Sequence, residues 1–163
     1  HLTESGAIVT VTDINDERVH QIGAKYGAKI FTGADLYSAD VDIYAPCALG
    51  ATINDNTIHN IKASIIAGAA NNQLANEAVH GKILKEKGIL YAPDFLINAG
   101  GVINVYSELV NWSREQVMQK TENIYNTALE IFKFADDNNI TTHQAAFSMA
   151  QKRIDDTKNG LNK

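Results

Sequence analysis

Cysteine is almost absent from this sequence. Cys47 is the only one among 163 residues, so the chain cannot form an internal disulfide, and we expect a reducing, cytoplasmic environment. No apolar run approaches the ~20 residues that cross a bilayer. The N-terminal residues also lack the basic and apolar regions of a secretory signal. Membrane and secreted classes are therefore not expected.

Basic residues are also few: the chain has 14 Lys and Arg and 19 Asp and Glu. The formal net charge of -5 argues against a nucleic-acid partner, which needs a basic face. The histidines show no metal-ligand spacing with one another, with Cys47 or with an acid, so we predict no metal site. Solvated or capping roles are the default interpretation for all five: His1, His20, His59, His80 and His143.

Proline occurs only twice, at Pro46 and Pro93, and each follows a short apolar run. Proline has no N–H to donate to a sheet ladder, so each marks the end of a strand. With three further runs there are five predicted strands, at residues 8–12, 29–32, 42–45, 64–67 and 89–91. Helical spacing fills the intervals at residues 16–25, 54–61 and 76–87.

Short strands that alternate with helices predict an α/β fold with a parallel sheet covered on both faces. After Gly101 the pattern changes to helices alone, at residues 102–110, 114–136 and 142–158. We therefore expect a Rossmann-like doubly wound parallel sheet followed by C-terminal helices. Residues 1–110 would form the sheet domain, and residues 111–163 a helical tail that packs on it or bridges to another domain.

The loops that come after the predicted strands share one chemistry. In an open parallel sheet, ligands bind beyond the carboxyl ends of the strands. Those positions hold small residues and amides without clustered charge: Asp13, residues 46–50, residues 68–73 and residues 93–101. This chemistry suits a neutral, flat, hydrogen-bonding ligand such as a nicotinamide riboside, and it does not suit a bare phosphate or a metal.

In the last of these loops, Asn98 is followed by the small residues 99–101, which let a ligand approach the backbone closely. Val102 and Val105 then share one apolar face if a helix starts at the glycines. A ligand loop and a glycine-rich helix cap over the core both remain open as interpretations.

The other polar candidates also have two interpretations. Asn71, Asn72 and Asn98 could hold a ribose or a carboxamide, or they could shape turns, to which asparagine is suited. Cys47 has apolar neighbours and no base near it in sequence, and we interpret it as a buried structural thiol.

Asp13 directly follows the first predicted strand. An acid at the end of the second strand of a dinucleotide-binding fold accepts hydrogen bonds from the adenosine ribose, and its charge would repel a 2′-phosphate. Asp13 therefore predicts NAD rather than NADP. The alternative is a helix N-cap, although Asp16 could take that role.

The glycine-rich turn that carries a dinucleotide's pyrophosphate is missing ahead of Asp13. Residues 1–6 are interpreted as the end of the helix that comes after such a turn, stopped by Gly6. The first strand and its glycines would lie upstream, and residues 1–110 would form an incomplete NAD-binding domain. The chain also has no plausible acid/base lysine or aspartate in a polar loop next to the ligand loops, and a solvated helix face is the interpretation for Lys82, Lys85 and Lys87.

Four segments carry a family resemblance: Val11–Asn15 (VTDIN), Ala45–Gly50 (APCALG), Ile66–Leu74 (IAGAANNQL) and Tyr91–Val105. Through them essentially the whole chain resembles the cofactor-binding domain of the leucine, phenylalanine and valine dehydrogenases, within the glutamate dehydrogenase-like superfamily. The leucine enzymes resemble it most. The resemblance implies NAD-dependent oxidative deamination of branched-chain L-amino acids, leucine foremost, to 2-oxo acids and ammonia, in a homo-oligomer.

The resemblance also implies site residues. The adenosine ribose and the adenine would contact Asp13 and Ile14. The remainder of the cofactor, from the cleft to the nicotinamide, would contact Cys47, Ala48, Ala70, Asn71, Asn72 and Asn98. The aliphatic side chain of the substrate would contact Val102 and Val105, in agreement with their shared face.

Departures from the family's pattern set limits. Asn71 leans toward the phenylalanine enzymes, and Gly50–Ala51 replaces a double glycine. The family's catalytic lysines and aspartate belong to an N-terminal substrate domain that this sequence lacks, so we expect this piece alone to be inactive and to hold no catalytic residue. The alternatives are a phenylalanine or valine dehydrogenase, or a non-catalytic nucleotide-binding or oligomerisation module built around residues 114–136.

Overall fold

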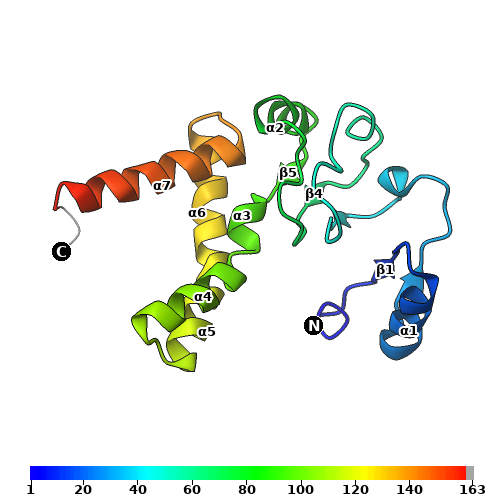
Figure 1. The fold of residues 1–163 in the computed structure, drawn as a ribbon. Coiled ribbons are helices and arrows are strands. Elements are labelled where there is room, and N and C mark those ends of the chain that lie inside the picture. Colours follow the sequence, from blue (N-terminus) through cyan, green and yellow to red (C-terminus); the bar gives the residue numbers. More distant parts are fainter. Residues whose placement is uncertain (161–163) are drawn as a thin grey trace. The chain divides into compact units, whose positions relative to one another are not determined.

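The computed structural model describes residues 1–160 and divides into two compact units, His1–Ala39 and Asp40–Lys163 (Figure 1). Both units contain parallel strands connected through helices or loops, and helices alone follow the last described strand. The predicted α/β class with parallel sheets and C-terminal helices is confirmed. The domain boundary at residue 110 stays a prediction, and residues 161–163 of the predicted tail lie outside the described residues.

The first unit contains β1 (Thr10–Val11), α1 (Asp16–Tyr26), β2 (Lys29–Ile30) and the 3-10 helix η1 (Leu36–Ser38). The two strands pair in parallel, with Thr10 opposite Lys29. Ahead of them, the Gly6 and Ala7 N–H groups donate to the Thr3 and Leu2 carbonyls, both at 3.0 Å. These two bonds form a Schellman motif around Gly6, although residues 2–6 are a turn rather than a helix.

The ends of α1 are explained by its flanking residues. Asn15 is the N-cap, because its side chain accepts the Arg18 N–H, so the alternatives that placed Asp13 or Asp16 there are wrong. Gly27 ends the helix in the left-handed conformation that a residue with a Cβ adopts only at a cost.

The second unit contains a parallel sheet in the order β3 (Ile43–Tyr44), β4 (Ile65–Ile66) and β5 (Leu90–Tyr91). Ile66 of the central strand is fully buried. The helix α2 (Glu77–Glu86) connects β4 to β5, and the Asn76 side chain caps it by accepting the Val79 N–H. The predicted helix over residues 76–87 is confirmed.

The predicted helix over residues 54–61 is wrong, because this segment forms turns. The Asn54 carboxamide accepts the Asn56 N–H at 3.0 Å, and the Thr57 hydroxyl donates to the Thr52 carbonyl at 2.6 Å. Local bonds of this kind offer the backbone an alternative to the helical ladder. Ile58 and Ile61 are nevertheless buried, so the segment still contributes to the core.

Five helices follow β5: α3 (Asp94–Ile97), α4 (Gly100–Val110), α5 (Arg114–Glu122), α6 (Ile124–Asp137) and α7 (Thr142–Lys158). The single helix predicted over residues 114–136 is divided at Asn123. Next to this point, the Thr121 hydroxyl donates to the Val117 carbonyl at 2.9 Å, a back-bond that often bends helices. The predicted helix over residues 142–158 agrees with α7.

The helices α6 and α7 share a core of small side chains. Ile131 and Ala135 of α6 pack with Ala145 and Ala146 of α7, and Leu96 of α3 lies against this cluster. Alanine at the crossing lets two helices approach closely. Among residues 1–160, no helix combines the length and apolar composition of a bilayer-spanning segment.

Candidate functional site

The loops after β3 and β4 meet at the carboxyl edge of the sheet in the second unit. The Ala70 N–H donates to the Pro46 carbonyl at 2.9 Å, and the Ala51 N–H donates to the Asn72 carbonyl at 2.7 Å. The predicted ligand loops at residues 46–50 and 68–73 are therefore neighbours in the structure.

Two glycines allow these loops to touch backbone to backbone. A Cβ at Gly68 would lie 2.1 Å from the Pro46 carbonyl oxygen, and one at Gly50 would lie 2.7 Å from the Asn71 carbonyl oxygen. Both distances are far below normal contact. At these two positions the small residue admits a neighbouring loop rather than a ligand.

The side chains of Asn71 and Asn98, which we call the amide pair, lie beside these loops. The Nδ2 atom of Asn98 donates to the Oδ1 atom of Asn71 at 2.5 Å and to the Ala69 carbonyl at 3.3 Å. Within the described residues, the Oδ1 atom of Asn98 and the amino group of Asn71 make no other hydrogen bond. One acceptor and one donor thus remain, which is the pattern that matches a primary carboxamide.

The other predicted cofactor residues of this unit lie nearby, with one correction. The Sγ atom of Cys47 accepts the Ala69 N–H at 3.5 Å, and Cys47 is exposed, so its interpretation as a buried thiol is wrong. Ala48 is exposed, and Ala70 is buried. Asn72 is exposed in a left-handed backbone conformation with φ 53°, as a turn residue would be.

A helix starts at the glycines after Asn98, which was the condition for Val102 and Val105 to share one apolar face. Gly100 and Gly101 form the first turn of α4, and a Cβ at Gly101 would meet no atom within 4 Å. Val102 and Val105 stand one turn apart on this helix and are 73% and 63% exposed. They offer an apolar face that no described part of the chain covers.

Asp13 and Ile14 belong to the first unit and are described there alone. Thr12 separates Asp13 from the end of β1. The Oδ1 atom of Asp13 accepts the Asn15 N–H at 2.9 Å. The Asp13 side chain is exposed and makes no other hydrogen bond within the described residues. The Ile14 side chain is completely exposed.

Two buried polar residues were not predicted from the sequence. Gln73 is fully buried, and Asp94 is 7% exposed at the start of α3. The Oδ2 atom of Asp94 accepts the Gln73 N–H at 2.8 Å, so the two connect the loop after β4 to α3. Burial, and then the charge of Asp94, raises the pKa of Tyr91 above its usual value. The only signal in the sequence was the acid directly after Pro93.

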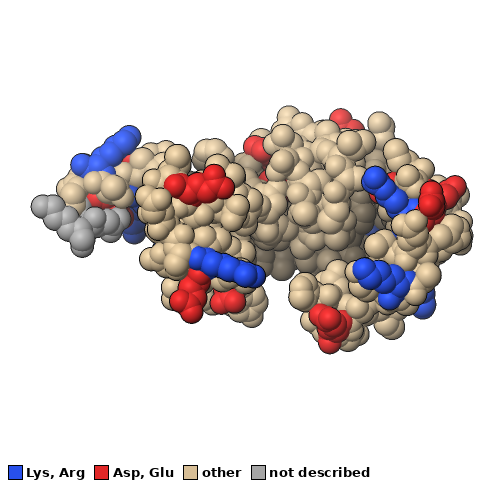
Figure 2. Space-filling view, turned by 60° about the horizontal axis from the view of Figure 1, so that its bottom comes forward, with Lys and Arg blue, Asp and Glu red and all other residues tan. Residues whose placement is uncertain are grey.

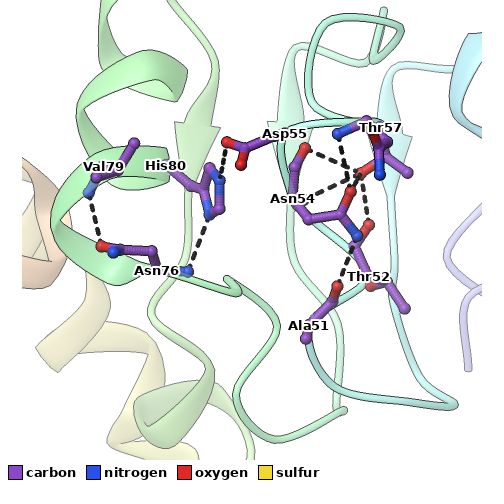
Figure 3. A network of polar contacts seen from close by, with 9 residues as sticks. Ala51, Thr52, Asn54, Asp55, Thr57, Asn76, Val79 and His80 are labelled. Carbon is purple, nitrogen blue, oxygen red and sulfur yellow. Dashed lines mark hydrogen bonds and ion pairs between the residues drawn. The ribbon is translucent and has the colours of Figure 1, made fainter.

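Of the two predicted roles, solvated or capping, His80 has the capping one, because its ring contacts Asn76, the N-cap residue of α2 (Figure 3). It is 3% exposed, its Nδ1 atom accepts the Asn76 N–H at 2.9 Å, and its Nε2 atom lies 3.0 Å from the Asp55 carboxylate. Nδ1 is thereby an acceptor, which leaves Nε2 as the donor to Asp55. His80 therefore joins α2 to the turn at residues 54–61.

Further contacts hold α2 in place, and Lys82, Lys85 and Lys87 are all exposed, as the predicted solvated face requires. Lys87 donates to the Ile58 and His59 carbonyls, each at 3.0 Å. Lys85 donates to the Asn139 carbonyl at 2.6 Å, and His143 pairs with Glu77 at 3.0 Å. Lys82 forms an exposed pair with Glu86.

Among residues 1–160, no charged side chain is hydrogen-bonded to either member of the amide pair. Within the described residues, no group of three His, Cys, Asp or Glu side chains could hold a metal ion. Figure 2 shows charged side chains scattered over a mostly uncharged face, without a continuous basic area on that side. Chemically, the site can bind and orient a neutral hydrogen-bonding group.

The sequence of this chain is similar to known proteins over nearly its whole length. The family model for glutamate/leucine/phenylalanine/valine dehydrogenase matches residues 4–160. The chain is 51% identical over 155 residues to leucine dehydrogenase of Geobacillus stearothermophilus, covering 95% of this chain and 42% of that protein. It is 45% identical over 163 residues to L-tryptophan dehydrogenase of Nostoc punctiforme, covering 100% of this chain and 46% of that protein.

The fold has a similar solved counterpart. The crystal structure of L-tryptophan dehydrogenase from Nostoc punctiforme matches with a TM-score of 0.88 and 46% identity, over 92% of this chain and 45% of that one. The chain thus spans less than half the length of the relatives it matches.

Proposed function

This chain belongs to the glutamate/leucine/phenylalanine/valine dehydrogenase family, and we propose that it is the NAD-binding part of an amino acid dehydrogenase. The complete protein would oxidatively deaminate branched-chain L-amino acids, leucine foremost, to 2-oxo acids and ammonia. Membership makes the chain part of an oxidoreductase family. The cofactor, the substrate and the site residues are the proposed part.

The observation that carries the proposal is the amide pair. The donor of Asn71 and the acceptor of Asn98 match the oxygen and the amino group of the nicotinamide carboxamide. The uncharged loops around them suit the neutral ring better than a phosphate. We therefore assign the nicotinamide end of NAD to Ala70, Asn71, Asn72 and Asn98, with Cys47 and Ala48 lining the adjoining cleft.

The adenosine end of the cofactor is assigned to Asp13 and Ile14. Asp13 has a carboxylate oxygen without a partner in the described residues, available to a ribose hydroxyl. Its negative charge would repel a 2′-phosphate and so favours NAD over NADP. The bare apolar surface of Ile14 suits a face of the adenine ring.

The role of this chain in the reaction is orientation. When bound, NAD supplies the acceptor for the hydride that leaves the substrate Cα. The amide pair would hold the nicotinamide against rotation, and the exposed Val102 and Val105 would receive the substrate's side chain. Proton transfer would be the task of lysine and aspartate residues outside this chain, so the chain alone would be inactive.

The residues of this chain distinguish weakly between possible amino acid substrates. An apolar pocket separates side chains that differ by one methylene by only about 1–3 kcal/mol. The leucine and tryptophan enzymes are relatives at 51% and 45% identity. Leucine is proposed because the two valines present small aliphatic surfaces. Phenylalanine or valine is the alternative substrate, and Asn71 leans toward the phenylalanine enzymes.

A non-catalytic assembly role is the second candidate. Leu109 and Tyr125 are 77% and 69% exposed on α4 and α6, which favours a covered surface in the complete protein. We assign these two exposed positions to contacts within a homo-oligomer, and an amino acid is the proposed small-molecule partner. The single thiol, Cys47, is consistent with a cytoplasmic location.

The proposal is tested with the complete protein that contains this chain. We expect NADH formation, followed by absorbance, with L-leucine and less with L-phenylalanine, L-valine and L-tryptophan. Asn98→Leu should weaken NADH binding about tenfold in a fluorescence titration, because it removes the carboxamide acceptor. The control Asn126→Leu, at an exposed position of α6, should not. No turnover with any of the four amino acids would leave the assembly role standing.

A further inference from the structure

Asp94 is hydrogen-bonded to both segments that carry the amide pair. Its backbone carbonyl accepts the Asn98 N–H at 3.0 Å, across the single turn of α3. Its Oδ2 atom accepts the Gln73 N–H at 2.8 Å, and its Oδ1 atom accepts the Phe95 N–H at 2.6 Å. One residue thus ties α3, which Asn98 caps at its C-terminal end, to the end of the loop that carries Asn71.

Gln73 shapes that loop from inside. Its Nε2 atom donates to the Gly68 carbonyl at 2.6 Å and to the Ala70 carbonyl at 3.0 Å. The carbonyl between these two, that of Ala69, is left to accept from Asn98. Gln73 therefore determines which carbonyl faces Asn98, because its two bonds turn the neighbouring carbonyls inward.

We propose that Asp94 and Gln73 are positioning residues that set the donor and acceptor pattern of the amide pair, an inference that rests on the proposed function. Neither residue would touch the cofactor, since both side chains are buried. They act on NAD through Asn98 and Asn71. If they shift, the donor and acceptor left over for a carboxamide shift with them.

The hydrogen-bond pattern explains why close isosteres would fail. Both carboxylate oxygens of Asp94 accept backbone N–H groups, and an asparagine there would turn its amino group toward one of those donors. Methionine in place of Gln73 would fill the same space without donating to either carbonyl. Each change disturbs the local geometry with little change in side-chain volume.

The experiment compares two ligands in the complete protein. NADH carries the nicotinamide, whereas ADP-ribose lacks it and reports only on the rest of the site. For Asp94→Asn we expect the Kd of NADH to rise about tenfold and that of ADP-ribose to change by less than about twofold. The control Glu115→Gln, which alters an exposed first-turn acid of α5, should leave both unchanged.

A second cycle separates positioning from general weakening. In an Asn98→Ala background, Asp94→Asn should have no further effect on the NADH to ADP-ribose ratio, because the group it positions is gone. If Asp94→Asn does not fold by circular dichroism, Gln73→Met takes its place in the same titrations. Absence of folded protein for both variants would overturn the proposal, since the residues would then only maintain the fold.

The possible results are distinct. Wild-type protein that binds NADH no more tightly than ADP-ribose would contradict the proposed nicotinamide site itself. Wild-type protein with the expected preference, and an Asp94→Asn variant that weakens both ligands equally, would overturn only the positioning role.

Discussion

At the scale of single residues, Gly68 is the position where size matters most in the candidate site. The atoms that a Cβ would meet are the Pro46 oxygen and nitrogen, at 2.1 and 2.4 Å, and both are backbone. Backbone cannot swing away as a side-chain tip can. The loops after β3 and β4 would have to separate to admit even one methyl group.

Replacing Gly68 by alanine should therefore destabilise the protein by at least about 1–3 kcal/mol, the usual cost of overpacking. Urea unfolding followed by circular dichroism measures this loss. Gly101→Ala is the matched control, because a Cβ there meets no atom within 4 Å and alanine favours a helix. Equal stability of the two variants would show that the loops separate at little cost.

The sequence identified the candidate residues on loops better than those in the interior. Asn71, Asn98 and the loop at residues 46–50 were predicted from their positions just beyond the ends of strands, and the structure brings them together. Gln73 was missed, and the contact of His80 with Asp55 was not predicted, because these partners are distant in sequence. A hydrogen bond from Gln73 to Asp94 spans 21 residues, and no local pattern signals it.

At the scale of elements, the crossing of α6 and α7 depends on alanines. Ala145 is completely buried between the helices. We expect Ala145→Leu to cost about 1–3 kcal/mol, because the extra atoms must push the helices apart. The thermal unfolding midpoint should fall accordingly. Ala150→Leu on the exposed side of the same helix should leave it nearly unchanged, and a comparable drop there would point to a helix effect instead.

The elements that sequence periodicity predicted correctly are those with clear boundaries. The last helix begins at a Thr141 capping box, and α2 begins at its Asn76 cap. Residues 54–61 carry the same apolar spacing but form turns, because Asn54 and Thr57 bond their own backbone. The spacing of apolar residues reflects which positions are buried. A buried turn can therefore show the same spacing as a helix.

At the scale of the whole molecule, Tyr91 couples stability to alkaline pH. Its pKa is raised in the folded protein, mainly by burial and then by Asp94. Above about pH 10 the unfolded chain releases a proton that the folded chain retains, so stability falls as pH rises. Below that pH this contribution is fully present.

Removing the buried phenol should remove part of this dependence. We expect Tyr91→Phe to lose stability less steeply than wild type between about pH 9 and pH 11. Urea unfolding at a series of pH values gives the slopes. Tyr125→Phe, at a 69% exposed position, should keep the wild-type slope. Parallel slopes for Tyr91→Phe and wild type would contradict the coupling.

The chain-level architecture was predictable in class but not in detail. Alternation of short strands and helices predicted parallel pairing, which the sheets β1–β2 and β3–β5 show. The compact units begin and end where contacts thin out at Ala39, and no composition change marks that point. Contact density depends on tertiary packing, which periodicity does not record.

Cys47 offers an experimental use of its own. It is the only thiol in the chain, it is exposed, and its sulfur touches the backbone of Ala69 beside the amide pair. Within this chain a maleimide dye would attach at one place only, on the rim of the proposed nicotinamide pocket. Its emission would respond to occupancy of that pocket, and a bound coenzyme would shield the sulfur from alkylation.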